Sequence, residues 1–275
     1  MTEPKLIQPE KPKDLPPIGL DDVLPFQCRR DLDCFTTCCQ NVSIILTPYD
    51  VLRMRKAMGI DSTEFLERYT LPAFTKEQKL PLLLLRMDPE TLRCPFVSDA
   101  GCAIYHDRPW ACRMYPLGLA EPRQATAQEQ PFHFLLQEDL CHGHGCGNTQ
   151  TVRQWLDGQG LEQFEAMEAP FKKLMLHEFW QRGEALSPEK AAMTYMAFYD
   201  IDRFRRFVFE SRFLNLFDVD EARVEALRVD DEELLDFAMD WLQFVLFGAR
   251  TMKLRPEVRE QAGKTAVVAA AAAGE

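Results

Sequence analysis

The order of apolar and polar positions changes character near residue 150. Upstream of it, three apolar or β-branched runs at 41–46, 80–87 and 132–137 have the length of strands. Thr47 and Asp61 each begin a helical pattern, and these patterns cover 48–58, where Gly59 ends the first, and about 62–69. The first half therefore predicts short strands and short helices joined by irregular stretches.

Downstream of residue 150, the polar residues at positions typical of helix N-caps are Thr151, Ser187, Asp200 and Asp230. Between Leu234 and Val245 apolar residues recur at spacings of three and four, which predicts an amphipathic helix that ends at Gly248 and packs against a core or a partner. We expect an α+β protein in which a loop-rich cysteine-cluster region, with a few short strands and helices, precedes a mainly helical C-terminal half.

Four segments follow from these patterns. Residues 1–20 are rich in proline and lysine and predict a disordered N-terminal tail. Residues 21–150 predict a cysteine-cluster metal-binding domain built largely from loops, and residues 151–250 a helical region that packs on it. Residues 251–275, alanine-rich after Gly263, predict a flexible C-terminal tail.

Charge and apolar run length limit the partners of the chain. With 43 acidic and 32 basic residues among 275, the formal net charge is −11, which opposes binding to nucleic acid or to anionic lipid. The first twenty residues contain no apolar signal region, and the longest apolar runs, 82–85 and 266–273, are far below the roughly 20 residues of a membrane span. We expect a cytoplasmic protein with no nucleic-acid and no membrane partner, and a protein partner stays open.

Nine cysteines are the main chemical signal. Four of them, Cys28, Cys34, Cys38 and Cys39, lie within twelve residues. Disulfide frameworks are typical of small exported domains with an even cysteine count, whereas this chain is long and its count is odd. We therefore interpret the thiols as ligands of a soft metal: an iron–sulfur cluster first, with zinc as the alternative. The predicted metal ligands are Cys28, Cys34, Cys38, Cys39, Cys94, Cys102, Cys112 and Cys141.

The adjacent pair Cys38-Cys39 bears on the number of metal atoms. Neighbouring Cα atoms lie about 3.8 Å apart while their side chains leave in different directions, so the pair does not suit one mononuclear ion. The sequence predicts either two centres bridged by this pair or one cluster with several metal atoms. The Cys-x3-Cys-x2-Cys pattern of radical S-adenosylmethionine enzymes fails, because Asn41 occupies its third position, and no Cys-x2-Cys knuckle of a zinc ribbon is present.

A second dense stretch is Cys141-His142-Gly-His144-Gly-Cys146. It is either a separate Cys/His metal tract or a glycine-rich loop that brings Cys141 to the upstream thiols, and the roles of His142, His144 and Cys146 stay open. Thiolates on a metal carry net negative charge, which nearby cations would offset. The arginines close to cysteines are Arg29, Arg30, Arg93, Arg108 and Arg113; they are either these cations or ordinary surface residues.

Further motifs accompany the cysteines: Cys94-Pro-Phe, Gly101-Cys102-Ala-Ile-Tyr105, Asp107-Arg108-Pro109 and Cys112-Arg113-Met-Tyr115-Pro116. Together with Phe26 to Cys39 they resemble the YkgJ-type cysteine-cluster family, described as zinc- or iron-chelating, over about 90 residues. That family opens with C-x2-C-x2-C-C, whereas this chain has the wider C-x5-C-x3-C-C. The same region is distantly similar to the cluster domain of flagellin lysine methylases, and this resemblance implies an iron–sulfur cluster with redox or radical-type chemistry.

Three functions are consistent with these observations. The first is a metal-binding protein whose cluster serves a redox or other oxidoreductase-type role. The second is a protein lysine N-methylase-like enzyme, although no side chain identifies a methyl-donor site or a lysine pocket. The third is a zinc-stapled module that binds a partner through its helical half. No acid–base constellation identifies catalytic residues, and His106, His133 and His177 are interpreted as structural.

Overall fold

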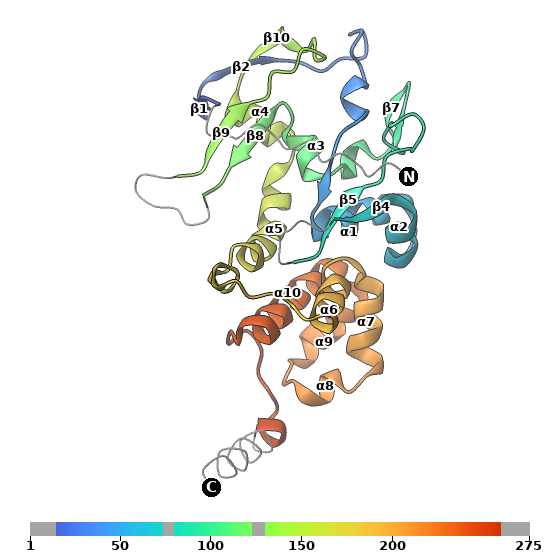
Figure 1. Ribbon diagram of the computed structural model, residues 1–275, viewed down its shortest axis with the longest axis vertical. Coiled ribbons are helices and arrows are strands. Elements are labelled where there is room, and N and C mark those ends of the chain that lie inside the picture. The colour runs from blue at the N-terminus through green and yellow to red at the C-terminus, as the bar shows by residue number, and fades with distance from the viewer. Residues whose placement is uncertain (1–14, 74–79, 123–129, 260–275) are drawn as a thin grey trace. The chain divides into compact units, whose positions relative to one another are not determined.

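The computed structural model describes residues 15–73, 80–122 and 130–259, and contacts divide the chain into two compact units, Met1–Ala169 and Pro170–Glu275 (Figure 1). The elements of the first unit are β1 (Pro17–Ile18), β2 (Val23–Phe26), η2 (Thr37–Cys39), β3 (Ile45–Leu46), α1 (Pro48–Met58), α2 (Ser62–Tyr69), β4 (Thr70–Ala73), β5 (Leu82–Leu85), β6 (Val97–Ser98), β7 (Gly101–Cys102), η3 (Tyr105–Asp107), α3 (Trp110–Met114), β8 (Leu117–Ala120), β9 (Phe132–Leu135), β10 (His144–Thr151) and α4 (Val152–Gly158). Helix α5 (Leu161–Met175) contains the point of division.

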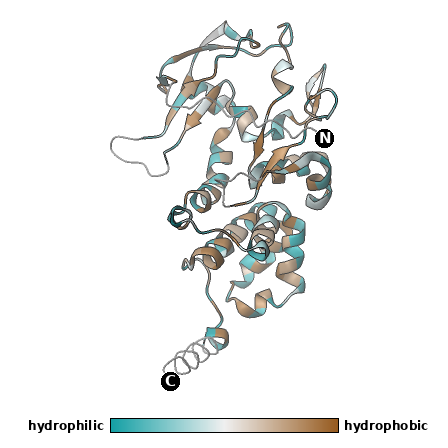
Figure 2. Cartoon of the chain, in the orientation of Figure 1, coloured by the Kyte–Doolittle hydropathy of each residue, from teal (hydrophilic) through white to brown (hydrophobic). Residues whose placement is uncertain are grey.

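The first unit contains four small antiparallel sheets. Their strand orders are β1-β9-β8, β10-β2, β3-β5-β4 and β6-β7. The central strand β5 is a run of four leucines, and Figure 2 shows it coloured as hydrophobic along its length. In β2, buried Leu24 and Phe26 alternate with exposed Val23 and Pro25, as expected where one face of a strand meets a core and the other meets solvent.

One apolar cluster joins β2 to the helices that follow β10. It consists of Leu24, Phe26, Met114, Leu117, Val152 and Leu161. Trp155 and Tyr115 pack against this cluster, and the ring of Phe26 meets the ring of Trp155 edge-on at 5.2 Å between centroids. The cluster therefore anchors the end of β2 that leads to Cys28, and Cys141 packs against the same cluster.

The second unit is helical. Its elements are η4 (Glu178–Arg182), α6 (Pro188–Tyr199), α7 (Ile201–Glu210), α8 (Phe213–Leu216), α9 (Glu221–Val229) and α10 (Asp231–Phe247). Its core contains a group of aromatic rings in which Trp241 of α10 meets Phe204 at 5.4 Å and Phe213 at 5.7 Å. The predicted amphipathic helix is α10, which ends at Gly248 in the left-handed region as expected. The α+β class and the helical second half are confirmed.

Local signals located most helices correctly. Helix α1 begins with a complete capping box between Thr47 and Asp50 and ends at Gly59, and α4, α6, α7 and α10 begin directly after their predicted caps. The predicted strands at 80–87 and 132–137 are β5 and β9 in shortened form. The strand predicted over 41–46 is limited to Ile45 and Leu46, because Asn41 has a φ of 55° and breaks the extended backbone.

The sequence predicted tails at both ends of the chain, over residues 1–20 and 251–275. Pro17 and Ile18, inside the predicted disordered tail, form β1 and pair with His133 and Phe134 of β9, so this part of the prediction is wrong. Proline has no donor to contribute, but it is tolerated on an edge strand such as β1. Residues 1–14 and 260–275 lie outside the described residues. The divisions predicted at residues 150 and 250 stay predictions. None of the described helices has the length and apolar character needed to cross a membrane.

Candidate metal centre

The first four cysteines lie on a loop that runs from the end of β2 to β3. Short turns shape it: the N–H groups of Leu32, Phe35 and Thr37 each donate to a carbonyl three residues earlier. Thr36 has a φ of 69°, and the 3₁₀ turn η2 follows it and carries Cys38 and Cys39. Cys28 is exposed and the other three are half-buried. All four thiols are free, as a metal-ligand function requires.

Cys141 joins three of these thiols, and together Cys28, Cys34, Cys38 and Cys141 form what we call the first thiol group. The pKa of Cys28 is raised to about 11, chiefly by burial. The negative charge that thiolates at Cys38, Cys141 and Cys34 would place beside it raises this pKa further. The Cys141 loop is held against β2 by the N–H of Gln27, which donates to the carbonyl of Gly143 at 3.1 Å. The prediction that this loop approaches the upstream thiols is consistent with this contact.

Gly143 makes that approach feasible. A Cβ atom at this position would lie 2.9 Å from the carbonyl oxygen of Gln27 and 2.9 Å from the ring of Phe26. We expect Gly143→Ala to push the Cys141 loop away from Cys28 and to lower both the melting temperature and the amount of metal retained on purification, measured by calorimetry and metal analysis.

Gly158→Ala is the matched control, because a Cβ there meets nothing within 4 Å and the φ of Gly158 is not positive. This control should keep the metal content and the melting temperature of the parent protein. Equal behaviour of the two variants would contradict the role assigned to the approach at Gly143.

Asp33 and His142 extend the first thiol group with oxygen and nitrogen donors. His142 Nδ1 lies 2.6 Å from Asp33 Oδ1, and the backbone N–H of His142 donates to Cys34 Sγ at 3.2 Å. Asp33, Cys34 and His142 bring one ligand atom each within 4.8 Å of one another. The imidazole holds the pKa of Asp33 below its usual range, chiefly through the side-chain hydrogen bond. A carboxylate in this place fixes the orientation of the imidazole, as it does beside metal-bound histidines.

Cys94, Cys102 and Cys112 form the second thiol group. Cys102 lies on β7 of the β6-β7 hairpin and pairs with Val97 of β6, and the N–H of Val97 donates to the carbonyl of Cys94, three residues earlier, at 3.2 Å. The Cys94 thiol accepts the N–H of Phe96 and the Cys102 thiol that of Ile104, and each bond opposes the rise in thiol pKa that burial causes. Cys94 and Cys102 therefore each accept a backbone N–H from the residue two positions later, and this arrangement favours a negative charge on both sulfurs.

Cys112 enters this group from helix α3. Burial raises its pKa to about 12, and the neighbouring Cys94, Asp50 and Cys102 add to the rise. Arg108 has the opposite effect on the pKa of both Cys102 and Cys112. Its side chain is buried and fixed by the carbonyl of Tyr105, the Oε1 atom of Gln159 and the ring of Tyr105 at 3.8 Å. Arg108 is thus a preplaced cation beside the second thiol group.

Asp50 positions the helix that carries Cys112. Its carboxylate is fully buried; Oδ1 accepts the N–H of Trp110 at 2.7 Å and Oδ2 that of Thr47 at 3.0 Å. One side chain therefore caps α1 and holds the start of α3. Burial raises the pKa of Asp50 to about 6.

This pKa predicts a pH dependence of stability. Because the folded-state pKa lies above the ordinary value of 3.8, Asp50 favours folding below about pH 4 and this contribution is lost as the pH rises through 6. We expect the unfolding free energy of the parent chain, relative to Asp50→Asn, to fall by about 2 kcal/mol between pH 4 and pH 7 in denaturant titrations. Parallel curves for the two proteins would contradict the raised pKa.

The Cys38-Cys39 pair links the first thiol group, which contains Cys38, to the second. The two side chains form a hydrogen bond, which is the main reason why the pKa of Cys38 is raised. The two thiols therefore lie closer together than we expected from the sequence, where the side chains of adjacent residues were predicted to point in different directions. On the other side, the carbonyl of Cys39 accepts the N–H of Cys94 at 2.8 Å, and Gln40 and Arg93 continue the pairing. The pair therefore connects the two groups through one thiol contact and one main-chain contact.

The donor set fits a soft metal in kind. In a tetrahedral zinc site with Zn–S distances of about 2.3 Å, sulfurs lie ~3.8 Å apart. Among residues 15–73, 80–122 and 130–259, no three thiols come within 4.8 Å of one another, and Asp33, Cys34 and His142 are the single set of three donors that does. The described thiols thus lie in one region, but no three of them are as close together as the ligands of one zinc ion would be.

A comparison with family models matches residues 27–147 to the CxxCxxCC family, described as a "Putative zinc- or iron-chelating domain". This segment is similar to that family. The match contains all nine cysteines and confirms the resemblance inferred from the motifs. No curated protein and no solved structure matches the chain. The similarity to flagellin lysine methylases stays a prediction.

Within the CxxCxxCC segment, the residues left open in the sequence take different positions. The thiol of Cys146 donates to the carbonyl of His142 at 3.2 Å and so closes the turn of its own loop. His144 packs its ring at 5.2 Å from the ring of Phe26, and burial lowers its pKa. His142 alone lies with a thiol and a carboxylate. Of the five arginines, Arg108 is the one whose charge favours the thiolate forms of Cys102 and Cys112.

Three residues that matter at this site were missed in the sequence. Asp33 directly precedes Cys34, and this adjacency could have indicated it. Asp50 is an ordinary acidic residue in the first turn of a helix, and its contact with Trp110 depends on a loop closure of 60 residues. Tyr115 lies against Cys141; burial first and this contact second raise its pKa, and its buried hydroxyl lacks a partner with normal hydrogen-bond geometry among the described residues.

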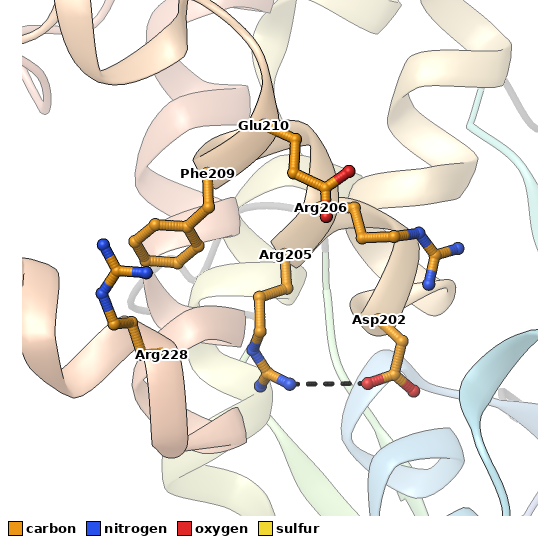
Figure 3. A pocket seen from close by; sticks show the side chains of 6 residues that line it. All are labelled: Asp202, Arg205, Arg206, Phe209, Glu210 and Arg228. Atoms are coloured by element: carbon orange, nitrogen blue, oxygen red, sulfur yellow. Dashed lines mark hydrogen bonds and ion pairs between the residues drawn. The ribbon is translucent and has the colours of Figure 1, made fainter.

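The helical second unit has an open pocket of about 330 Å³ outside the CxxCxxCC segment. Its lining residues are Asp202, Arg205, Arg206, Phe209, Glu210 and Arg228. Figure 3 shows Arg205 pointing toward Asp202 and Arg228 lying against the ring of Phe209. Arg205 Nη1 lies 3.5 Å from Asp202 Oδ1, and Arg228 Cζ lies 4.2 Å from the centre of the Phe209 ring. Arg205 also pairs with Asp231, so two of the three guanidinium groups are engaged in holding the helices together.

Proposed function

We propose that this chain is a cytoplasmic metal-binding protein that holds an iron–sulfur cluster through its cysteines and uses it in a redox role. The observation that carries the proposal is the gathering of eight free thiols by five separate stretches of the first unit. Free thiols gathered in this way are ligands for iron–sulfur clusters, zinc or cuprous copper.

Iron–sulfur binding is favoured over a single zinc by the spacing of the thiols. No three of the described thiols lie within 4.8 Å of one another, as the ligands of one ion would, and a cluster binds its thiolates to different iron atoms. Backbone N–H groups that donate to the sulfurs of Cys34, Cys94 and Cys102 are of the kind that sets the reduction potential of such clusters. Bound to these thiols, a cluster would supply one-electron chemistry. The chain's own residues would hold and orient it.

The cation Arg108 supports the same proposal electrostatically. Four thiolates on a metal leave a net charge of about −2, which is costly to bury without compensation. Arg108 is fixed by neutral partners, the carbonyl of Tyr105 and the amide of Gln159, so no carboxylate among the contacts found for it cancels its charge. That charge is therefore directed at Cys102 and Cys112.

The test is a metal analysis of the full chain purified without oxygen. Bound iron with a matching amount of sulfide and a broad visible absorption would support the proposal. A colourless protein with stoichiometric zinc would overturn the redox role and would favour the zinc-stapled module, in which the separate helical unit binds a partner. A protein free of any metal would overturn metal binding itself.

A methylase-like activity is the alternative that the flagellin methylase resemblance suggests. It requires a methyl donor, so the purified protein should bind S-adenosylmethionine in a calorimetric titration. No binding under conditions in which the cluster is intact would remove this alternative and leave the redox proposal unaffected.

A further inference from the structure

We propose that Asp33, Cys34 and His142 form a site for one divalent metal ion of the zinc type, in addition to the iron–sulfur cluster. Each residue supplies a different kind of donor: a carboxylate oxygen, a thiolate sulfur and an imidazole nitrogen. The inference goes beyond the proposed function, because this ion does not depend on the presence of the cluster. It assigns Cys34 to a mixed ligand set and leaves the other predicted thiol ligands to the cluster.

The three donors converge from two distant parts of the chain. Asp33 and Cys34 lie on the loop after β2, and His142 precedes β10, 109 positions beyond Asp33. One ligand atom of each residue lies within 4.8 Å of the other two, and no other set of three such donors is found in the part of the chain that the structure describes. The fold therefore brings these donors together, since adjacency in sequence explains only Asp33 and Cys34.

Backbone contacts hold the two loops against each other at this point. The N–H of His142 donates to Cys34 Sγ at 3.2 Å, so the main chain of one loop meets the sulfur of the other. The carbonyl of Gly143 accepts the N–H of Gln27 at 3.1 Å, and the thiol of Cys146 donates to the carbonyl of His142 at 3.2 Å. The approach of the donors is thus fixed by the main chain and does not depend on exposed side chains alone.

The contact between Asp33 and His142 marks the place of the ion. Nδ1 of the imidazole lies 2.6 Å from Oδ1 of the carboxylate. A tetrahedral zinc ion bound to both atoms at about 2.0–2.1 Å would hold them ~3.3 Å apart. Both side chains are exposed, so an opening of roughly 0.7 Å disturbs no buried packing. On binding, Cys34 releases its thiol proton to solvent, and the neutral imidazole carries its proton on Nε2, away from the ion.

Charge and donor type favour an ion of the zinc type. One carboxylate and one thiolate balance its two positive charges, so the site needs no compensating cation. Thiolate, imidazole and carboxylate are all ordinary zinc ligands, whereas iron–sulfur clusters are held mainly by thiolates. Asp33 and His142 are exposed and Cys34 is half-buried, so the ion reaches the site from solvent. Three protein ligands leave the fourth tetrahedral position to water.

The experiment compares zinc binding by the full chain, purified without oxygen, with that of single variants. Equilibrium dialysis at buffered free zinc concentrations would be applied to the parent, Asp33→Asn, His142→Ala and Asp31→Asn. Asp31 is the matched control, because it is an exposed aspartate on the same loop that pairs with Arg29 and lies outside the donor set. One zinc should bind equally to the parent and to Asp31→Asn, and its affinity should fall at least about tenfold in the other two variants.

X-ray absorption at the zinc edge identifies the donors directly. The zinc that the parent binds and His142→Ala loses should have sulfur at about 2.3 Å together with nitrogen or oxygen at about 2.0–2.1 Å. Zinc held by other thiols would be the same in all four proteins and cancels in this comparison.

Three results would overturn the inference: a parent that binds no zinc, equal zinc affinity in the parent, Asp33→Asn and His142→Ala, or zinc bound by sulfur alone. The iron and sulfide content of the same samples tests the proposed function separately. A chain without iron that keeps the zinc dependent on His142 would overturn the cluster and leave this site in place. Circular dichroism checks folding, and His142→Gln repeats the test if His142→Ala does not fold.

Discussion

Replacing Arg113 with methionine is expected to lower the free energy of unfolding by about 3–5 kcal/mol, because the change removes a buried guanidinium that donates to three main-chain carbonyls. Arg113 is buried, and its guanidinium donates to the carbonyls of Arg108 at 3.0 Å, Gln159 at 2.7 Å and His106. It also lies over the ring of Phe164 at 4.2 Å. One side chain therefore ties η3, α3 and the end of α4 together.

The matched control is Arg29→Met. Both arginines directly follow a cysteine, and the sequence offered both as compensating cations. Arg29, however, has an exposed side chain that pairs with exposed Asp31 at 3.4 Å, and such pairs contribute at most about 1 kcal/mol. Thermal unfolding should show a melting temperature lower by on the order of 10 °C for Arg113→Met and almost unchanged for Arg29→Met. Equal shifts would show that the carbonyl contacts of Arg113 do not stabilise the fold.

The contrast between these two arginines shows what the sequence could and could not predict. Sequence adjacency to a cysteine is the same for both. The burial of the two side chains differs, because the burial of Arg113 depends on the approach of Gln159 and Phe164, which are about 50 residues away in the chain. The sequence therefore identified the kind of residue at the site, and only the fold assigned Arg113 to main-chain carbonyls and Arg108 to the thiols.

The same distinction applies to the fold. Helix α1 could be predicted because Thr47 and Gly59 are local signals that act at the two ends of the helix itself. Strands β1 and β10 were missed because each is stabilised by a partner far away in sequence; β1 pairs with β9, and β10 with β2. The short apolar run of β5 was found because all four positions are leucine, three of them buried.

For the site, the eight cysteines could be proposed from their identity and density, but their division could not. Cys94 and Cys112 are separated by 17 intervening residues, yet they lie in one group, and Cys141 lies beside Cys28 although 112 residues intervene. Spacing along the chain is thus a poor guide to which thiols lie close together when turns and hairpins intervene.

Removing the metal is expected to expose the loop between β2 and β3 to proteolysis. Between residues 27 and 44 no side chain is buried, and η2 is the single regular element. Hydrophobic burial therefore does not hold this loop, and we expect its order to depend on metal bound to Cys28, Cys34, Cys38 and Cys39. Arg29 and Arg30 are exposed there and are trypsin sites. Cleavage after them should become at least tenfold faster once a chelator has removed the metal.

Limited digestion followed by mass spectrometry measures this directly. Arg250, exposed just after α10 in the second unit, provides the internal control, because no thiol lies in that unit and its cleavage should be unaffected by the chelator. Acceleration at both sites would mean that the chelator unfolds the chain as a whole. Unchanged cleavage at Arg29 and Arg30 after complete loss of metal would show that the turns at Leu32, Phe35 and Thr37 suffice to order the loop, and would contradict the dependence of this loop on the metal.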